Sequence, residues 1–69
     1  MENVTFYIEE ETVVKKVLVI NNNNEEDKLL SINIRGELAK IVIIKKYEEK
    51  KIHFNDVNLE DIQIEEIKG

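Results

Sequence analysis

Residues 29–46, LLSINIRGELAKIVIIKK, decide the fold class. Between residues 29 and 35 every second side chain is aliphatic and the intervening ones are mostly polar. This alternation is typical of a β-strand that buries one of its two faces. Gly36-Glu37 follows, and a glycine at the first central position is typical of a two-residue type II′ turn. The sequence therefore predicts a β-hairpin that turns at residues 36–37.

The register of this hairpin follows from the turn. Each inward residue of the first strand then meets an apolar partner: Ile34 faces Ala39, Ile32 faces Ile41, and Leu30 faces Ile43. A slip by one residue would turn one strand over, so this agreement supports the register. A loop at residues 47–50 leads to a third strand, 51–55, which completes a meander. Its predicted inner face is Leu30, Ile32, Ile34, Ala39, Ile41, Ile43, Ile52 and Phe54.

The rest of the chain supplies further strands. Residues 4–8 alternate, and residues 12–20 contain the apolar run VLVI, which predicts a central strand buried on both faces. The NNNNEEDK stretch at residues 21–28 predicts a surface loop. Around residues 62–67 the apolar positions share no helical stripe, which favours a short strand over a short helix. We predict an all-β fold, a small antiparallel β-sandwich or open barrel of five to six strands with a central meander (29–35, 38–46, 51–55).

Length and composition indicate a single β domain over residues 1–69. The chain has eleven Ile, seven Val and five Leu, enough for one small core, and no Cys, Pro or Trp. The absence of Cys excludes disulfides and Cys-ligated zinc. The longest apolar runs are four residues, and the first residues, MENVTFYIEEE, lack the pattern of a signal peptide. We therefore expect a cytoplasmic protein that does not associate with a membrane.

Few residues could carry catalysis or bind a cofactor. The chain has one His, His53, and one Ser, Ser31, with no glycine pattern for a nucleophile elbow or a phosphate loop. Residues 56–61, DVNLED, imitate the start of a calcium loop, but Asp61 and Ile67 replace its glycine and its final glutamate. We expect a protein that is not an enzyme and has no cofactor, metal site or catalytic residue.

The outer face of the predicted meander mixes basic and aliphatic residues. A solvated sheet face would not carry such a cluster of aliphatic side chains, so we expect a second layer or another subunit to cover it. The candidate interaction face is Leu29, Arg35, Lys40, Val42, Ile44, Lys46, Lys51 and His53.

The net charge of −5 is unevenly distributed along the chain. Residues 1–27 carry −5, residues 28–53 carry +4 and residues 54–69 carry −4. Opposite charges on neighbouring strands stabilise a sheet, and a basic hairpin can also bind a polyanion. The main hypothesis is a non-enzymatic protein–protein interaction or structural module that self-associates. The alternatives are a small acidic inhibitor that mimics nucleic acid or blocks a basic site, and RNA or DNA binding through the basic face, which net acidity and scarce aromatics disfavour.

About a third of the chain resembles small immunoglobulin-like β-sandwich modules. The matching positions are Glu11, Val13, Val17, Val19 and Asn21, then Asn24, Asp27, Leu30 and Ile32. The resemblance implies adhesion or scaffolding between proteins, with no catalytic residues. A second stretch, Ile34-Arg35-Gly36 followed by Ile41, looks like the second Sm motif of RNA-binding rings, but the first Sm motif is absent.

Overall fold

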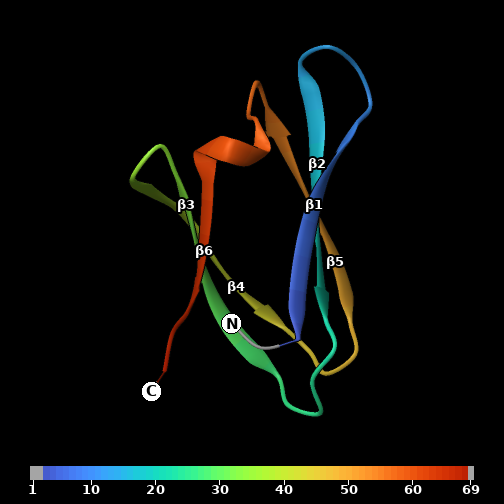
Figure 1. The fold of residues 1–69 in the computed structure, drawn as a ribbon, viewed down its shortest axis with the longest axis vertical. Helices are drawn as coiled ribbons and strands as arrows, with labels where there is room; N and C mark the ends of the chain where they lie inside the picture. The colour runs from blue at the N-terminus through green and yellow to red at the C-terminus, as the bar shows by residue number, and fades with distance from the viewer. Residues whose placement is uncertain (1–2, 69) are drawn as a thin grey trace.

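Six β-strands make up almost all of the fold. The structure is a computed structural model that describes residues 3–68. The strands are β1 (Val4–Glu10), β2 (Lys15–Asn22), β3 (Lys28–Ile34), β4 (Glu37–Ile44), β5 (Glu49–Asn55) and β6 (Ile62–Glu66). They form two three-stranded antiparallel sheets, β4-β3-β6 on the left of Figure 1 and β1-β2-β5 on the right. The predicted all-β fold is confirmed.

One hydrophobic core lies between the two sheets. Its buried residues come from every strand and from the segment before β6: Val4, Leu18, Ile20, Leu30, Ile32, Val42, Ile44, Ile52, Val57 and Ile62. Alternate residues of each strand point into this core, as in other sandwiches of two sheets. The sheets of residues 3–68 are not closed into a barrel, so the sandwich is the observed architecture.

Strand β2 is the central strand of its sheet, as its apolar run predicts. Val17, Leu18, Val19 and Ile20 are all at most 3% exposed. Leu18 and Ile20 belong to the core between the sheets, whereas Val17 and Val19 alternate with them and face outward. The strand is therefore buried on both faces, although only one of them is covered by another sheet.

The hairpin between β3 and β4 turns one residue earlier than predicted. Arg35 and Gly36 have positive φ angles of 52° and 82°, and the first ladder pair beyond them is Ile34 with Glu37. Two positive φ angles in a two-residue loop define a type I′ turn, so the predicted type II′ turn is wrong. A turn one residue earlier pairs each residue of β3 with a β4 residue two positions closer to the turn. This change alone would keep the same side chains of β4 on the inward face.

A β-bulge after the turn inverts the faces of β4. The ladder pairs Asn33 with Leu38 and then Ile32 with Lys40, which leaves Ala39 as an extra residue. Val42 and Ile44 are therefore buried, 6% and 0% exposed. The predicted inner face is wrong at three positions, which lie outside the core: Ala39, Ile41 and Ile43. It is right at the other five, of which Ile34 and Phe54 are partly buried: Leu30, Ile32, Ile34, Ile52 and Phe54.

The predicted meander is wrong in its third strand. Strand β5 contains residues 51–55, but it pairs with β2 in the other sheet, so Ile43 does not face Phe54. The chain crosses between the sheets through residues 45–48, where Glu48 N–H donates to the Lys45 carbonyl at 3.0 Å. Consecutive strands usually pair with each other, but a four-residue connection can also lead into another sheet, which is why the sequence pattern misassigned β5.

The segment before the C-terminus forms a strand, as predicted. Strand β6 pairs with β3, and a single turn of 3₁₀ helix, η1 (Leu59–Asp61), precedes it. The Asp61 carboxylate accepts a hydrogen bond from Asn58 N–H at 3.4 Å and closes this turn. No helix within residues 3–68 is long and apolar enough to cross a membrane.

Candidate protein-interaction face

The outward surface of the β4-β3-β6 sheet carries a cluster of exposed aliphatic side chains. These are Leu29, Leu38, Ile41 and Ile43, which are 37%, 59%, 52% and 57% exposed. We call these four residues the apolar face. Exposed aliphatic side chains gathered on one surface are typical of interaction sites, whereas single ones are common everywhere.

The strand register holds the apolar face together. Leu29 lies opposite Ile43 in the β3–β4 ladder, and Ile41 and Leu38 lie opposite the small polar residues Ser31 and Asn33. On the other side of β3, Ile67 N–H donates to the Leu29 carbonyl at 2.8 Å. The chain therefore continues along β3 beyond β6 and brings partly buried Ile67 beside Leu29.

The sequence of β4 makes an apolar outer surface unavoidable. Residues 41–44 are all aliphatic, and adjacent side chains of a strand point to opposite faces. Either register would leave two of them outside the core, and the bulge at Ala39 selects Ile41 and Ile43. Strand β4 therefore contributes to the core with one face and to the apolar face with the other.

The outward surface of the β1-β2-β5 sheet is different. Its central residues Val17 and Val19 are 3% and 0% exposed, although no sheet covers them. Longer side chains flank them on the neighbouring strands: Glu9 and His53 beside Val17, and Tyr7 and Lys51 beside Val19. His53 Nε2 also lies 3.3 Å from Glu11 Oε1, across the end of this surface. One sheet therefore covers its outer aliphatic residues with its own side chains, and the other does not.

The structure divides the eight predicted interaction residues between the core, both sheets and the connections. Val42 and Ile44 belong to the core, so their placement on an exposed face was wrong; the inverted faces of β4 are the cause. Leu29 belongs to the apolar face. Lys51 and His53 lie on β5, in the opposite sheet.

The remaining three predicted residues lie at the margins of the β4-β3-β6 sheet. Arg35 is in the turn, where its Nη2 lies 3.4 Å from Asp61 Oδ2. Lys46 is in the connection to β5, and its N–H donates to Asp27 Oδ1 at 2.9 Å. Lys40 is exposed on β4, with Ile32 as its ladder partner. These three do not lie together with Lys51 and His53 on one basic surface.

Sequence reasoning missed three of the four residues of the apolar face. Leu38, Ile41 and Ile43 were either assigned to the core or left without a role, because nothing in the residue types signals a bulge at Ala39. The usable signal was the continuous aliphatic run at residues 41–44, which demands partners on both faces of the strand.

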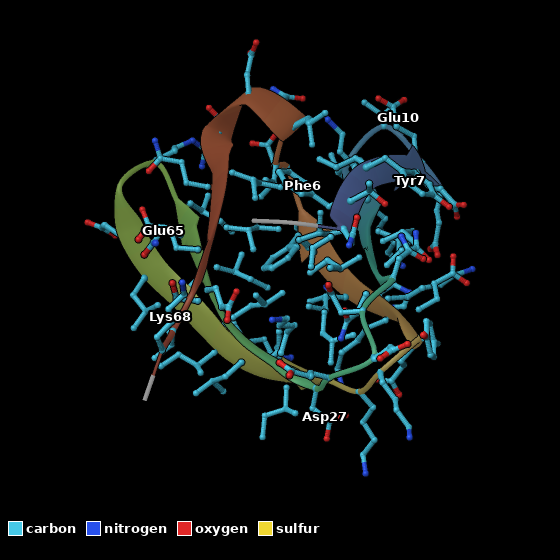
Figure 2. The ribbon with its side chains drawn as sticks, turned by 60° about the horizontal axis from the view of Figure 1, so that its bottom comes forward. Phe6, Tyr7, Glu10, Asp27, Glu65 and Lys68 are labelled. Carbon is cyan, nitrogen blue, oxygen red and sulfur yellow. The ribbon has the colours of Figure 1, made fainter. Side chains whose placement is uncertain are left out.

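Two acidic residues from the two ends of the chain, Glu10 and Glu65, lie far apart in the fold (Figure 2). Figure 2 places Glu10, at the end of β1, and Glu65, on β6, on opposite sides of the molecule. The same view shows β1 at the upper right and β6 descending on the left, with Phe6 between them. Glu10 and Glu65 therefore do not share one surface.

A hollow open to solvent lies next to the β2–β3 loop. Its volume is about 450 Å³, and it is lined by Asn3, Asn23, Asn24, Glu25, Glu26 and Tyr47. Within residues 3–68, no group of three or more His, Cys, Asp or Glu side chains is arranged to hold a metal ion. The hollow is therefore a polar groove beside a loop.

Comparison with known proteins gives no relative from which a function could be transferred, because no family model, no curated protein and no solved structure matches this chain. The resemblance to immunoglobulin-like modules therefore stays a prediction. Arguments about function rest on the surfaces described above.

Proposed function

We propose that this protein is a non-enzymatic binding module that associates with protein through its apolar face. The observation that carries the proposal is the contrast between the two outer surfaces. Val17 and Val19 are buried under flanking side chains, while Ile41 and Ile43 remain more than half exposed. A chain that covers one outer surface and leaves the other aliphatic has kept the second surface available for a partner.

The energetics favour coverage of the apolar face. Full burial of one aliphatic side chain contributes about 1.5–3 kcal/mol relative to full exposure, so each half-exposed isoleucine retains roughly half of that. Four neighbouring side chains together supply the kind of dry centre that protein interfaces have. A small domain, which buries only about 60% of its unfolded surface, benefits more than a large one from such a partner.

The charge distribution gives less support to the two alternative hypotheses. An acidic inhibitor would need its acids on one surface, whereas Glu10 and Glu65 lie on opposite sides of the molecule. Binding of a nucleic acid backbone would need a continuous basic track, whereas Lys40 and Lys51 belong to different sheets. The four residues of the apolar face, in contrast, lie together on the outward surface of one sheet.

Position-specific photo-crosslinking tests the proposed function. A photo-reactive amino acid is introduced at Leu38, on the apolar face, and separately at Lys51, on the outer surface of the other sheet. Irradiation in the cell that makes the protein is expected to give discrete protein adducts from position 38 and none from position 51. The adduct should disappear when Ile41→Thr and Ile43→Thr are added. Equal labelling from both positions, or no discrete adduct, would overturn the proposal.

A further inference from the structure

We infer that this protein pairs with a second copy of itself along the free edge of strand β1, so that the β1-β2-β5 sheets of the two copies join into one continuous sheet. The two β1 strands run antiparallel about a two-fold axis, with Tyr7 opposite Tyr7 and Phe6 opposite Ile8. This contact uses a sheet edge and leaves the apolar face free, so it is independent of the proposed function.

Alternate residues of β1 leave their backbone groups unpaired. At the two ends of the β1–β2 ladder, Asn23 N–H donates to the Asn3 carbonyl at 2.8 Å and Glu11 N–H donates to the Lys15 carbonyl at 3.0 Å. The register between these two bonds is continuous, so the odd-numbered residues of β1 bond to β2. No other strand of residues 3–68 pairs with β1. The residues that direct N–H and C=O toward this free edge are therefore Val4, Phe6, Ile8 and Glu10.

The other three edge strands carry features that oppose edge pairing. Strand β4 has the bulge at Ala39 and places Lys40 opposite the core residue Ile32. Strand β5 places Lys50 opposite the core residue Ile20. Strand β6 has only five residues. Bulges, inward charged residues and very short strands all block the pairing of one edge with another.

Strand β1 is a regular edge strand of seven residues. Its one inward charge is at its last residue, Glu10, which faces Lys16 on β2. Its other inward side chains are apolar, and Phe6 and Ile8 are only partly buried at the margin of the core. Figure 2 shows Phe6 between β1 and β6, the edge strands on this side of the sandwich. A strand laid along β1 would therefore find free backbone groups and apolar side chains together.

The residues of β1 are suited to pairing with themselves. With Tyr7 on the two-fold axis, every even-numbered residue meets an even-numbered residue, so each free N–H faces a free C=O of the other copy. On the inward face Phe6 meets Ile8 twice, and on the outward face the 42% exposed Tyr7 meets its own copy. Aromatic–aromatic and aromatic–β-branched pairs are favoured across strands. These pairs specify a second copy as the occupant of the edge.

The acidic end of β1 selects the antiparallel direction. Glu9, Glu10 and Glu11 follow one another at this end. Parallel pairing would bring them beside the same carboxylates of the other copy. In the antiparallel register Glu9 meets Thr5 and Glu10 meets Val4. The two copies of Glu9 are then separated by four residues, about 14 Å along the strands, which exceeds the screening length of about 8 Å at physiological salt.

The dimer should be weak. Seven residues make a contact about 24 Å long, and a single strand edge covers less than the roughly 800 Å² per partner of a standard interface. The net charge of −5 on each copy adds repulsion that salt screens. We expect a dissociation constant on the order of 100 µM that decreases when salt is added.

Disulfide cross-linking of the full chain tests the register. The chain has no Cys, so one engineered thiol can form a disulfide only with a second molecule. Tyr7→Cys should give a disulfide-linked dimer in a glutathione redox buffer, because non-hydrogen-bonded antiparallel pairs hold their Cα atoms about 4.5 Å apart, within disulfide range. The matched controls Thr5→Cys and Glu9→Cys lie on the same face of β1. Each alone should cross-link at least about tenfold less, whereas their mixture should form the mixed disulfide.

Sedimentation equilibrium tests the use of backbone groups. Between about 20 µM and about 2 mM, the mass of the original chain should rise from 8.1 kDa toward twice that value. Glu10→Pro removes an N–H that points away from β2 and should weaken the dimer roughly tenfold. Glu10→Ala removes the same charge, keeps the N–H and should associate at least as tightly as the original. Thermal denaturation followed by circular dichroism checks that both variants are folded.

Three outcomes would overturn the inference. The first is a mass of 8.1 kDa at about 2 mM, and the second is equal cross-linking from the three single Cys variants. The third is a dimer that Glu10→Pro leaves intact and that Ile41→Thr with Ile43→Thr dissociates, because the second copy would then lie on the apolar face. None of these results depends on the adduct from position 38, so the inference and the proposed function can fail separately.

Discussion

Asn22 connects three segments that no ladder joins. Its side chain is 1% exposed, and its Nδ2 donates to the carbonyls of Glu26, Ile44 and Lys45 at 2.9, 3.0 and 3.2 Å. Its Oδ1 accepts from Asn24 N–H at 3.0 Å. The Asn22 amide therefore links the β2–β3 loop to the crossing between the sheets, together with the bond from Lys46 N–H to Asp27 Oδ1. The sequence predicted only a solvated run of four asparagines here, because the second of the four is chemically identical to its neighbours.

Replacing the Asn22 side chain should lower the stability of the fold. Asn22→Ala removes the donor to one buried carbonyl, Ile44, and two partly buried ones, and we expect it to lower the free energy of unfolding by about 2–4 kcal/mol. Asn21→Ala, at the adjacent and more exposed position of the same strand, should change it by less than about 1 kcal/mol. Urea denaturation of both variants measures the difference. Equal losses would mean that the Asn22 network is not what stabilises this end of the sandwich.

At the scale of elements, the β3–β4 hairpin separates what the sequence determines from what it leaves open. Alternation placed Leu30, Ile32 and Ile34 correctly, because one face of β3 is buried and the other is polar. The same reasoning failed for β4, whose aliphatic residues occupy both faces, so that either register is compatible with burial. The bulge at Ala39 made the choice, and nothing in the residue types of β4 specifies a bulge at that position.

The turn itself can be tested at Gly36. Its φ of +82° is unfavourable for any residue with a Cβ, although a Cβ there would meet nothing within 4 Å. Gly36→Ala should therefore destabilise the fold by about 1–2 kcal/mol through backbone strain alone. Gly36→Asn should cost clearly less, because Asn tolerates positive φ. Thermal denaturation ranks the two variants, and an alanine variant as stable as the original would contradict the type I′ turn.

The inverted faces of β4 can be tested with one pair of substitutions. Ile44→Ala removes a side chain that is fully buried and should cost about 2–5 kcal/mol. Ile41→Ala removes the same atoms from an exposed position and should cost less than about 1 kcal/mol. Urea denaturation of the two variants, measured at the same protein concentration, gives the comparison. The reverse order of costs would restore the register without the bulge.

At the scale of the whole molecule, the sequence predicted the number and position of the strands but not their division between sheets. Strand β5 was assigned to the sheet of its neighbour β4, because sequence proximity favours adjacent pairing. Its actual partner, β2, lies about thirty residues away in the chain, and no local pattern encodes that distance. The predicted interaction face is wrong for two reasons. The bulge at Ala39 was not foreseen, which placed Val42 and Ile44 outside the core, and β5 was assigned to the wrong sheet, which placed Lys51 and His53 there as well.

The single core predicts one cooperative unfolding unit. Both sheets contribute to it, so amide hydrogen exchange in the central strands β2 and β3 should be limited by global unfolding. Edge strands β1, β4, β5 and β6 should exchange faster at their open sides. NMR-detected hydrogen exchange at several denaturant concentrations measures the exchange rate of each backbone amide and shows which amides exchange through global unfolding. Protection confined to one of the two sheets would show that they unfold separately.

The bulge at Ala39 also bears on how this gene tolerates changes in length. Leu38 and Lys40 pair with consecutive residues of β3, and Ala39 between them has no ladder partner. Deletion of Ala39 would therefore leave a regular strand in which the same side chains face the core and the solvent. Loss of Val42 would instead shift every residue before it by one and reverse the faces of that part of the strand. In an alignment of related chains, we therefore expect one-residue gaps to be tolerated at position 39 and excluded from residues 41–44.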